Sequence, residues 1–149
     1  MERYRTKSAV FALLLRHNQE EVLLQQRFQT GIGDGHYDLA AGGHVEAQES
    51  MKQALVRELH EELDLTVKPA NLEFATLIHA NYGDDTVYYC GYFVVKDYQG
   101  TPLIAEPDQA SQLDWYSVHD LPHNLLWDRR RALENYQRGI PYDEVGWHN

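Results

Sequence analysis

One short segment of the chain combines two periodicities that both predict a helix. Its apolar side is a stripe of leucines one turn apart: Leu55, Leu59 and Leu63. Its other side carries three carboxylates within an arc of roughly 100°: Glu58, Glu61 and Glu62. Carboxylates this close repel one another by on the order of a few kcal/mol per pair, which a divalent cation would offset. Because hard oxygen ligands suit Mg²⁺ or Mn²⁺, the segment predicts a packed helix with a metal-binding flank.

A glycine pair precedes this helix at a defined distance. Gly43 is followed after five residues by Glu49, and after seven more by Arg57 and Glu58. The spacing, continued to Leu65, resembles the Nudix box, G-x5-E-x7-R-E-U-x-E-E-x-G-U with U aliphatic. Asp64 stands where that pattern has Gly. We expect Asp64 to adopt the left-handed conformation that ends the helix, at a cost of roughly 1 kcal/mol.

The resemblance implies a role for each matching residue. Nudix proteins are hydrolases that cleave a diphosphate linked to another moiety, usually a nucleoside. The expected metal ligands are the Gly42 carbonyl and three carboxylates: Glu58, Glu61 and Glu62. A structural role in joining loop to helix is expected for Gly43, Glu49 and Arg57. The resemblance also implies a mixed β-sheet between helices.

Four positions outside the helix are candidates for contact with substrate or water. Arg27 ends a predicted strand, and a guanidinium fork suits phosphate; His44 follows the glycine pair and faces the expected phosphate region. Glu106 lies in a loop where relatives place a further acid that binds metal or accepts a proton from water, and Asp108 is its nearest rival. The expected catalytic residues are therefore Glu61, Glu62 and Glu106. Relatives that act on oxidised guanine nucleotides have an Asn near position 124 that reads the base edge, but Asn124 is interpreted here as the N-cap of the last helix.

The pattern of apolar runs and turn residues predicts an α/β fold, an α/β/α sandwich with a mixed sheet. Expected loops or turns are 17–20, 30–35, 83–85 and 100–108. Strands are predicted over 9–15, 21–26, 72–81, 86–96 and 112–117. Helices are predicted over 49–63 and 125–138. At 149 residues we expect one domain, residues 1–149.

Composition narrows the function further. The formal net charge of −10 argues against nucleic-acid binding and implies that a cation separates this protein from any phosphate substrate. The single cysteine, Cys90, lies in an apolar run and is expected to be an inert core residue of a cytoplasmic protein. No apolar run approaches the ~20 residues of a membrane helix, and no signal-peptide pattern opens the chain. A homodimer is compatible with the sequence.

We therefore expect a Mg²⁺- or Mn²⁺-dependent hydrolase of a small-molecule nucleoside diphosphate derivative. The substrate is either a nucleoside triphosphate, oxidised or not, giving monophosphate and pyrophosphate, or a nucleotide sugar. Two alternatives stay open. A non-catalytic Nudix module that binds a nucleotide would typically have lost box glutamates, all of which are present here. An isopentenyl-diphosphate isomerase would need a reactive cysteine with a further Glu nearby, and Cys90 alone is poor support.

Overall fold

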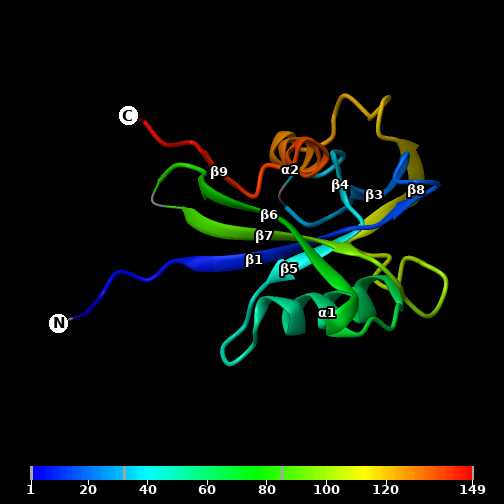
Figure 1. Ribbon diagram of the computed structural model, residues 1–149, viewed down its shortest axis with the longest axis horizontal. Helices are drawn as coiled ribbons and strands as arrows, with labels where there is room; N and C mark the ends of the chain where they lie inside the picture. The colour runs from blue at the N-terminus through cyan, green and yellow to red at the C-terminus, as the bar shows by residue number, and fades with distance from the viewer. Residues whose placement is uncertain (1, 32, 85, 149) are drawn as a thin grey trace.

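Two helices enclose the strands of this protein, in a computed structural model that describes residues 2–31, 33–84 and 86–148. Helix α1 (Met51–Leu63) lies on one side of the sheet layer and α2 (Trp127–Arg138) on the other (Figure 1). The predicted α/β/α sandwich with a mixed sheet is confirmed. Ile32 and Asp85, which fall in two of the predicted loops, lie outside the described residues, as do the first and last residues of the predicted domain.

The described strands form two sheets. The larger, five-stranded sheet has the order β5-β1-β7-β6-β9 and is mixed, since β1 and β7 run parallel whereas β6 and β7 run antiparallel. Its strands are β1 Lys7–Leu13, β5 Ala41–His44, β6 Leu72–Asn81, β7 Val87–Val95 and β9 Tyr142–Val145. In the four-stranded sheet, β3 pairs antiparallel with each of the other three. Its strands are β2 Leu15–Arg16, β3 Glu21–Arg27, β4 Tyr37–Leu39 and β8 Ala110–Ser117.

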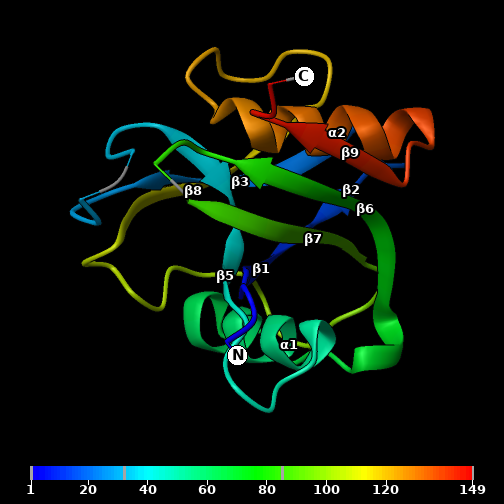
Figure 2. The same ribbon diagram turned by 90° about the vertical axis from the view of Figure 1, so that its left-hand side faces the viewer.

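Strand β1 lies inside the larger sheet, between β5 and β7, and its sequence shows why. Alternate residues of a strand face opposite sides, so Phe11 and Leu13 join the core beneath α2, whereas Val10 and Ala12 join the core beneath α1. Both faces are buried, which accounts for the nearly continuous apolar run of this segment. Figure 2 shows the two helices from the end of the molecule, with the strands between them.

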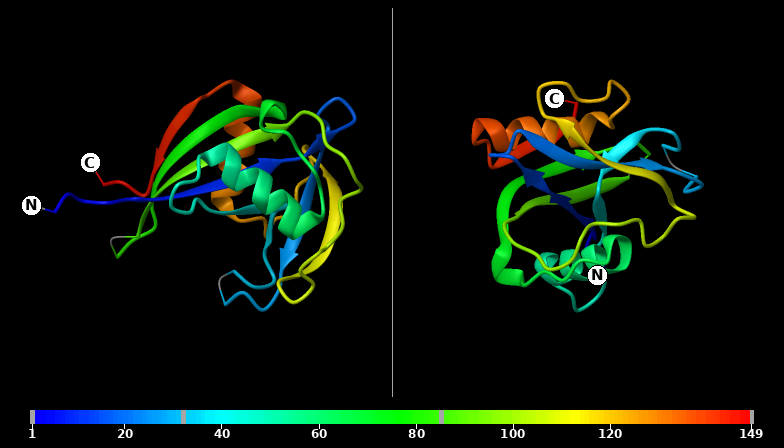
Figure 3. Two further views of the ribbon diagram at one scale, coloured as in Figure 1. Left: turned by 90° about the horizontal axis from the view of Figure 1, so that it is seen from below. Right: turned by 90° about the vertical axis from the view of Figure 1, so that its right-hand side faces the viewer.

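The connection between β7 and β8 positions part of the site. It runs past the C-terminal end of α1 (Figure 3). Two backbone hydrogen bonds attach it there, from Leu103 N to Leu63 O at 3.2 Å and from Ala105 N to Glu62 O at 2.9 Å. Glu106 follows directly, so the fold brings this loop residue beside the last turn of the helix.

The sequence predictions missed three short strands and misplaced some helix ends. Strands β4, β5 and β9 were not predicted, because runs of three or four residues carry too little periodicity to be recognised. The two helices begin at Met51 and Trp127 rather than at the expected residues 49 and 125. Within the described residues, neither helix has the length and hydropathy required to span a bilayer.

Candidate active site

Helix α1 is capped at both ends, which fixes the direction of its glutamates. Ser50 is the N-cap: its hydroxyl accepts from Gln53 N at 3.1 Å, while the Gln53 side chain accepts from Ser50 N at 2.8 Å. At the other end Asp64 has φ 57° and ψ 37°, the expected left-handed conformation, and its N–H bonds to His60 O. This prediction is confirmed, and Asp64 replaces Gly without disrupting the helix end.

Arg57 joins the loop before the helix to the helix itself. Its Nε and Nη2 donate to the two carboxylate oxygens of Glu49 at 2.7 and 2.9 Å, a paired geometry that a lysine cannot form. The same guanidinium donates to the His44 carbonyl at 3.1 Å and to Glu58 Oε1 at 2.8 Å. Hydrogen bonds from Arg57 lower the pKa of Glu49 to about 2. The structure thus places Glu49 and Arg57 in the contact that the motif suggests.

The two glycines before the loop are required for different reasons. A Cβ on Gly43 would overlap the Glu58 carboxylate, so this glycine leaves room for an acidic side chain. A Cβ on Gly42 would overlap the Phe11 ring and lie 2.8 Å from the Val10 carbonyl oxygen, so this glycine leaves room for the core. Neither residue has a positive φ. Both needs are therefore steric rather than conformational.

Three carboxylates lie close together where α1 meets β5 and the β7–β8 connection. They belong to Glu58, Glu62 and Glu106. The pKa of Glu62 is raised to about 8, chiefly by burial and in addition by the negative charges of Glu58, Glu106 and Asp38. Burial also raises the pKa of Glu58, outweighing its hydrogen bond to Arg57. Glu62 Oε2 accepts from Gly42 N at 2.9 Å. Among the described residues, no arginine, lysine or histidine forms an ion pair with Glu62 or Glu106.

This arrangement suits a hydrated divalent cation. The residues that the structure describes contain no group of three His, Cys, Asp or Glu side chains close enough to hold an ion directly. Mg²⁺, however, keeps several waters and is commonly held by one or two carboxylates. Glu61 is not gathered with the others: half of its side chain is exposed, and it lies 3.4 Å from Arg57 Nη1. Two of the gathered carboxylates, Glu58 and Glu62, could therefore hold a hydrated ion, and Glu106 adds its negative charge beside them.

A cavity of about 760 Å³ extends from these carboxylates between the larger sheet and the start of α2. Six residues proposed from the sequence line it: Arg27, Gly42, Gly43, His44, Glu62 and Glu106. Its sheet wall carries an aromatic row, with ring centroids 5.5 Å apart from His44 to Tyr88 and 6.0 Å apart from Tyr88 to Tyr82. Trp127, more than half exposed, stands at its margin. The cavity thus combines acidic, basic and aromatic groups.

Sequence reasoning missed the buried charged wall of this cavity. Asp38 of β4 accepts from Arg27 Nη1 and Arg129 Nε, each at 2.8 Å. Asp128 accepts from Tyr82 at 2.6 Å and from Arg129 Nη1 at 2.9 Å. A signal for Arg129 was present, because it precedes Ala132 and Leu133 at the i, i+3, i+4 spacing of a buried helix face. Asp38 had no comparable signal.

Two of the sequence interpretations need correction or comment. Asn124 does not cap the last helix: Leu126 is the N-cap residue, no side chain caps it, and Asn124 Nδ2 donates to Gly35 O at 3.1 Å. The reason is a turn, closed by Leu125 N and Pro122 O, which delays the helix beyond Asn124. Asp108, the rival of Glu106, is exposed and is not among the residues that line the cavity.

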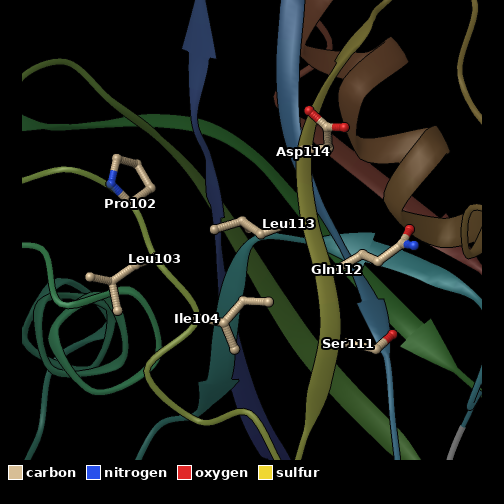
Figure 4. A pocket seen from close by; sticks show the side chains of 7 residues that line it. All are labelled: Pro102, Leu103, Ile104, Ser111, Gln112, Leu113 and Asp114. Carbon is tan, nitrogen blue, oxygen red and sulfur yellow. The ribbon is translucent and has the colours of Figure 1, made fainter.

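A second hollow, of about 560 Å³, lies between the β7–β8 connection and β8. Figure 4 shows Leu103 and Ile104 on one side and Leu113 on the other. None of the candidate site residues lines it, so the larger cavity is the one that carries the predicted chemistry.

The NUDIX domain model matches residues 5–136. The oxidized purine nucleoside triphosphate hydrolase of Danio rerio is 30% identical over 124 residues, which cover 80% of this chain and 73% of that protein. The NAD-capped RNA hydrolase NudC of Pseudomonas entomophila is 32% identical over 105 residues, 69% of this chain but 34% of its own. This chain therefore spans about a third of the length of that relative.

Solved structures agree with the sequence matches. A MutT NUDIX hydrolase from Burkholderia pseudomallei has a TM-score of 0.77 at 25% identity, covering 89% of this chain and 98% of its own. The E. coli ORF135 protein has a TM-score of 0.74 at 28% identity, with 90% of each chain covered. With its box, its sandwich fold and a family match over nearly its whole length, this chain belongs to the NUDIX domain family.

Proposed function

We propose that this protein is a divalent-metal-dependent hydrolase that cleaves the diphosphate linkage of small nucleoside diphosphate derivatives. One observation carries the proposal: Glu58, Glu62 and Glu106 crowd beside a large cavity, and no described cationic side chain pairs with Glu62 or Glu106. The charges of Glu58 and Glu106 help to raise the pKa of Glu62, and negative charge crowded in this way favours binding of a cation. A cation at this place would lie between the acidic protein and an anionic substrate.

In this proposal Mg²⁺ or Mn²⁺ is held by Glu58 and Glu62, with Glu61 and the Gly42 carbonyl completing the set. A bound divalent ion would neutralise phosphate charge and lower the pKa of water. Glu106, Glu61 or Glu62 orients the attacking water and accepts its proton. The protein's further contribution to catalysis is positioning. A phosphoryl group held in line with the attacking water reacts far faster than one that is not held in that orientation.

The cavity also offers binding groups for the substrate. Arg27 presents a guanidinium from the end of β3, held by Asp38, and is proposed to contact the phosphates. His44, the last residue of β5, lines the same cavity and is proposed to contact the substrate as well. The Tyr88–Tyr82 row suits the flat face of a nucleobase, because aromatic rings stack on bases of any sequence.

The relatives support a nucleotide as substrate. The Danio rerio relative is named for oxidized purine nucleoside triphosphates, and the fish protein matches over most of both chains. The NudC relatives act on NAD-capped RNA but match over a third of their length, and a net charge of −10 disfavours a polyanionic partner. We therefore propose a free nucleotide, a triphosphate or a nucleotide sugar, rather than RNA.

Hydrolysis is favoured over the two alternatives. A non-catalytic module is disfavoured because every box glutamate is retained and Glu58, Glu62 and Glu106 lie together. Isomerisation through a thiol is disfavoured because Cys90 is 2% exposed and burial raises the pKa of its thiol.

The decisive experiment is a turnover panel of nucleoside triphosphates, oxidised triphosphates and nucleotide sugars, with Mg²⁺, with Mn²⁺ and with excess EDTA. We expect hydrolysis with metal and none with EDTA. Glu62→Gln should lose at least about 100-fold in kcat, whereas Glu73→Gln, which breaks a surface pair with Lys96, should keep wild-type turnover. Turnover that survives EDTA, or an equal loss in both variants, would overturn the proposal.

A further inference from the structure

The run Arg129-Arg130-Arg131 does not behave as one basic face. Arg131 pairs at the surface with Asp143, and Arg130 donates to the Pro122 carbonyl at 2.7 Å. Arg129 instead is 9% exposed and turns into the protein. A buried guanidinium carries a large desolvation cost unless it is fully paired, so its surroundings indicate what it does.

Arg129 is held on three sides. Its Nε donates to Asp38 at 2.8 Å, and its Nη1 donates to Asp128 at 2.9 Å and to the Tyr92 hydroxyl at 3.3 Å. Its guanidinium carbon lies 3.7 Å from the centroid of the Phe11 ring, a close cation–π contact. Phe11 also stacks on Tyr92, with centroids 5.1 Å apart. Arg129 and Tyr92 therefore fix the position of one ring.

That ring lies against the backbone of the glutamate site. Phe11 is the cross-strand partner of Gly42, and packs so closely on it that a Cβ there would overlap Cδ1 of the ring. The Gly42 amide in turn donates to Glu62 Oε2 at 2.9 Å. A continuous series of contacts thus runs from Arg129 through Phe11 and Gly42 to Glu62.

We propose that Arg129 is a positioning residue for the metal site: through Phe11 it holds the Gly42 amide in place to orient the Glu62 carboxylate. The inference rests on the proposed function in one respect, that Glu62 binds the cation. Groups that hold metal ligands in place commonly contribute 10–100-fold to metal affinity. Because Arg129 acts through two intervening residues, we expect the lower end of that range, about tenfold.

The test measures Mn²⁺ affinity of the substrate-free protein by electron paramagnetic resonance titration. Arg129→Lys keeps the charge for Asp38 and Asp128 but loses the flat surface over Phe11. Phe11→Leu keeps an apolar side chain but loses the ring. Each should raise the Mn²⁺ Kd about tenfold. The Kd of the double variant should be no higher than the higher of the two single-variant values, because both substitutions act on one series of contacts.

Arg131→Lys is the matched control, since it alters a surface pair on the same helix, and should leave the Kd within about twofold. If Arg129→Lys and Phe11→Leu also stay within twofold, or if their effects multiply in the double variant, the inference is wrong. Should Arg129→Lys fail to fold, Phe11→Leu alone decides by the same criterion. A wild-type protein that binds Mn²⁺ but hydrolyses nothing would refute the proposed activity and leave this result intact; one that binds no Mn²⁺ would refute both.

Discussion

Replacing Gly43 by Ala should disable the site while sparing the fold. The three atoms nearest to the new methyl group all belong to the Glu58 carboxylate, and Gly43 has no positive φ to strain. The carboxylate has to move by roughly 1 Å, and misplacement on that scale costs about 100-fold in rate, or about 2.7 kcal/mol in the barrier. Because a flexible side chain yields more easily than backbone, the stability cost should stay near 1 kcal/mol, the low end for overpacking.

Gly42→Ala provides the contrast. Its methyl group meets the Phe11 ring and lies 2.8 Å from the Val10 carbonyl oxygen, so backbone has to shift. We expect a loss of about 3 kcal/mol in unfolding free energy, the high end for overpacking. Gly91→Ala is the control for a strand glycine, since its methyl group meets the flexible Met51 side chain at 2.7 Å and none of the atoms nearest to it belongs to a glutamate. It should keep wild-type kcat.

The assay combines urea denaturation with turnover and Mn²⁺ titration for the three variants. We expect Gly42→Ala to have the lowest unfolding free energy of the three variants. Gly43→Ala should have the lowest turnover per amount of folded protein. If Gly43→Ala keeps more than about a third of wild-type kcat with an unchanged Mn²⁺ Kd, the Glu58 carboxylate does not need the space that this glycine leaves. The steric account of the motif would then be refuted.

Three further predictions concern the Arg57–Glu49 contact and the C-terminal end of α1 at Asp64. Arg57→Lys should lower kcat about tenfold, because a lysine cannot donate in parallel to both oxygens of Glu49 while holding Glu58 and the His44 carbonyl; an unchanged kcat would contradict this. Asp64→Gly should raise the unfolding free energy by about 1 kcal/mol by removing the strain of a left-handed residue, without altering kcat; urea midpoints test it, and a loss of stability would count against it. The pKa of Glu49 is lowered in the folded protein from 4.5 to about 2, so Glu49 stabilises the fold above pH 4.5 and loses that contribution as the pH falls toward 2. The difference in unfolding free energy between wild type and Glu49→Gln should therefore shrink between pH 5 and pH 2, and a constant difference would refute this.

The sequence by itself determined the box helix, its two faces and the central strands. These features depend on local spacing: leucines one turn apart, an acidic flank, and an apolar run long enough to be buried on both sides. The left-handed end at Asp64 was predictable from its place in the motif, which has Gly where this helix ends. Each of these is a property of neighbours along the chain.

Only the tertiary structure decided which charged groups meet. Asp38 and Arg129 are 91 residues apart, yet one carboxylate oxygen joins them at 2.8 Å. Glu106 reaches Glu62 because backbone hydrogen bonds attach its loop to the end of α1, and Glu61 turns outward despite adjoining Glu62 in sequence. Asn124 was misread because a turn delayed the helix. Contacts of this kind depend on packing between distant segments, which periodicity along the chain does not encode.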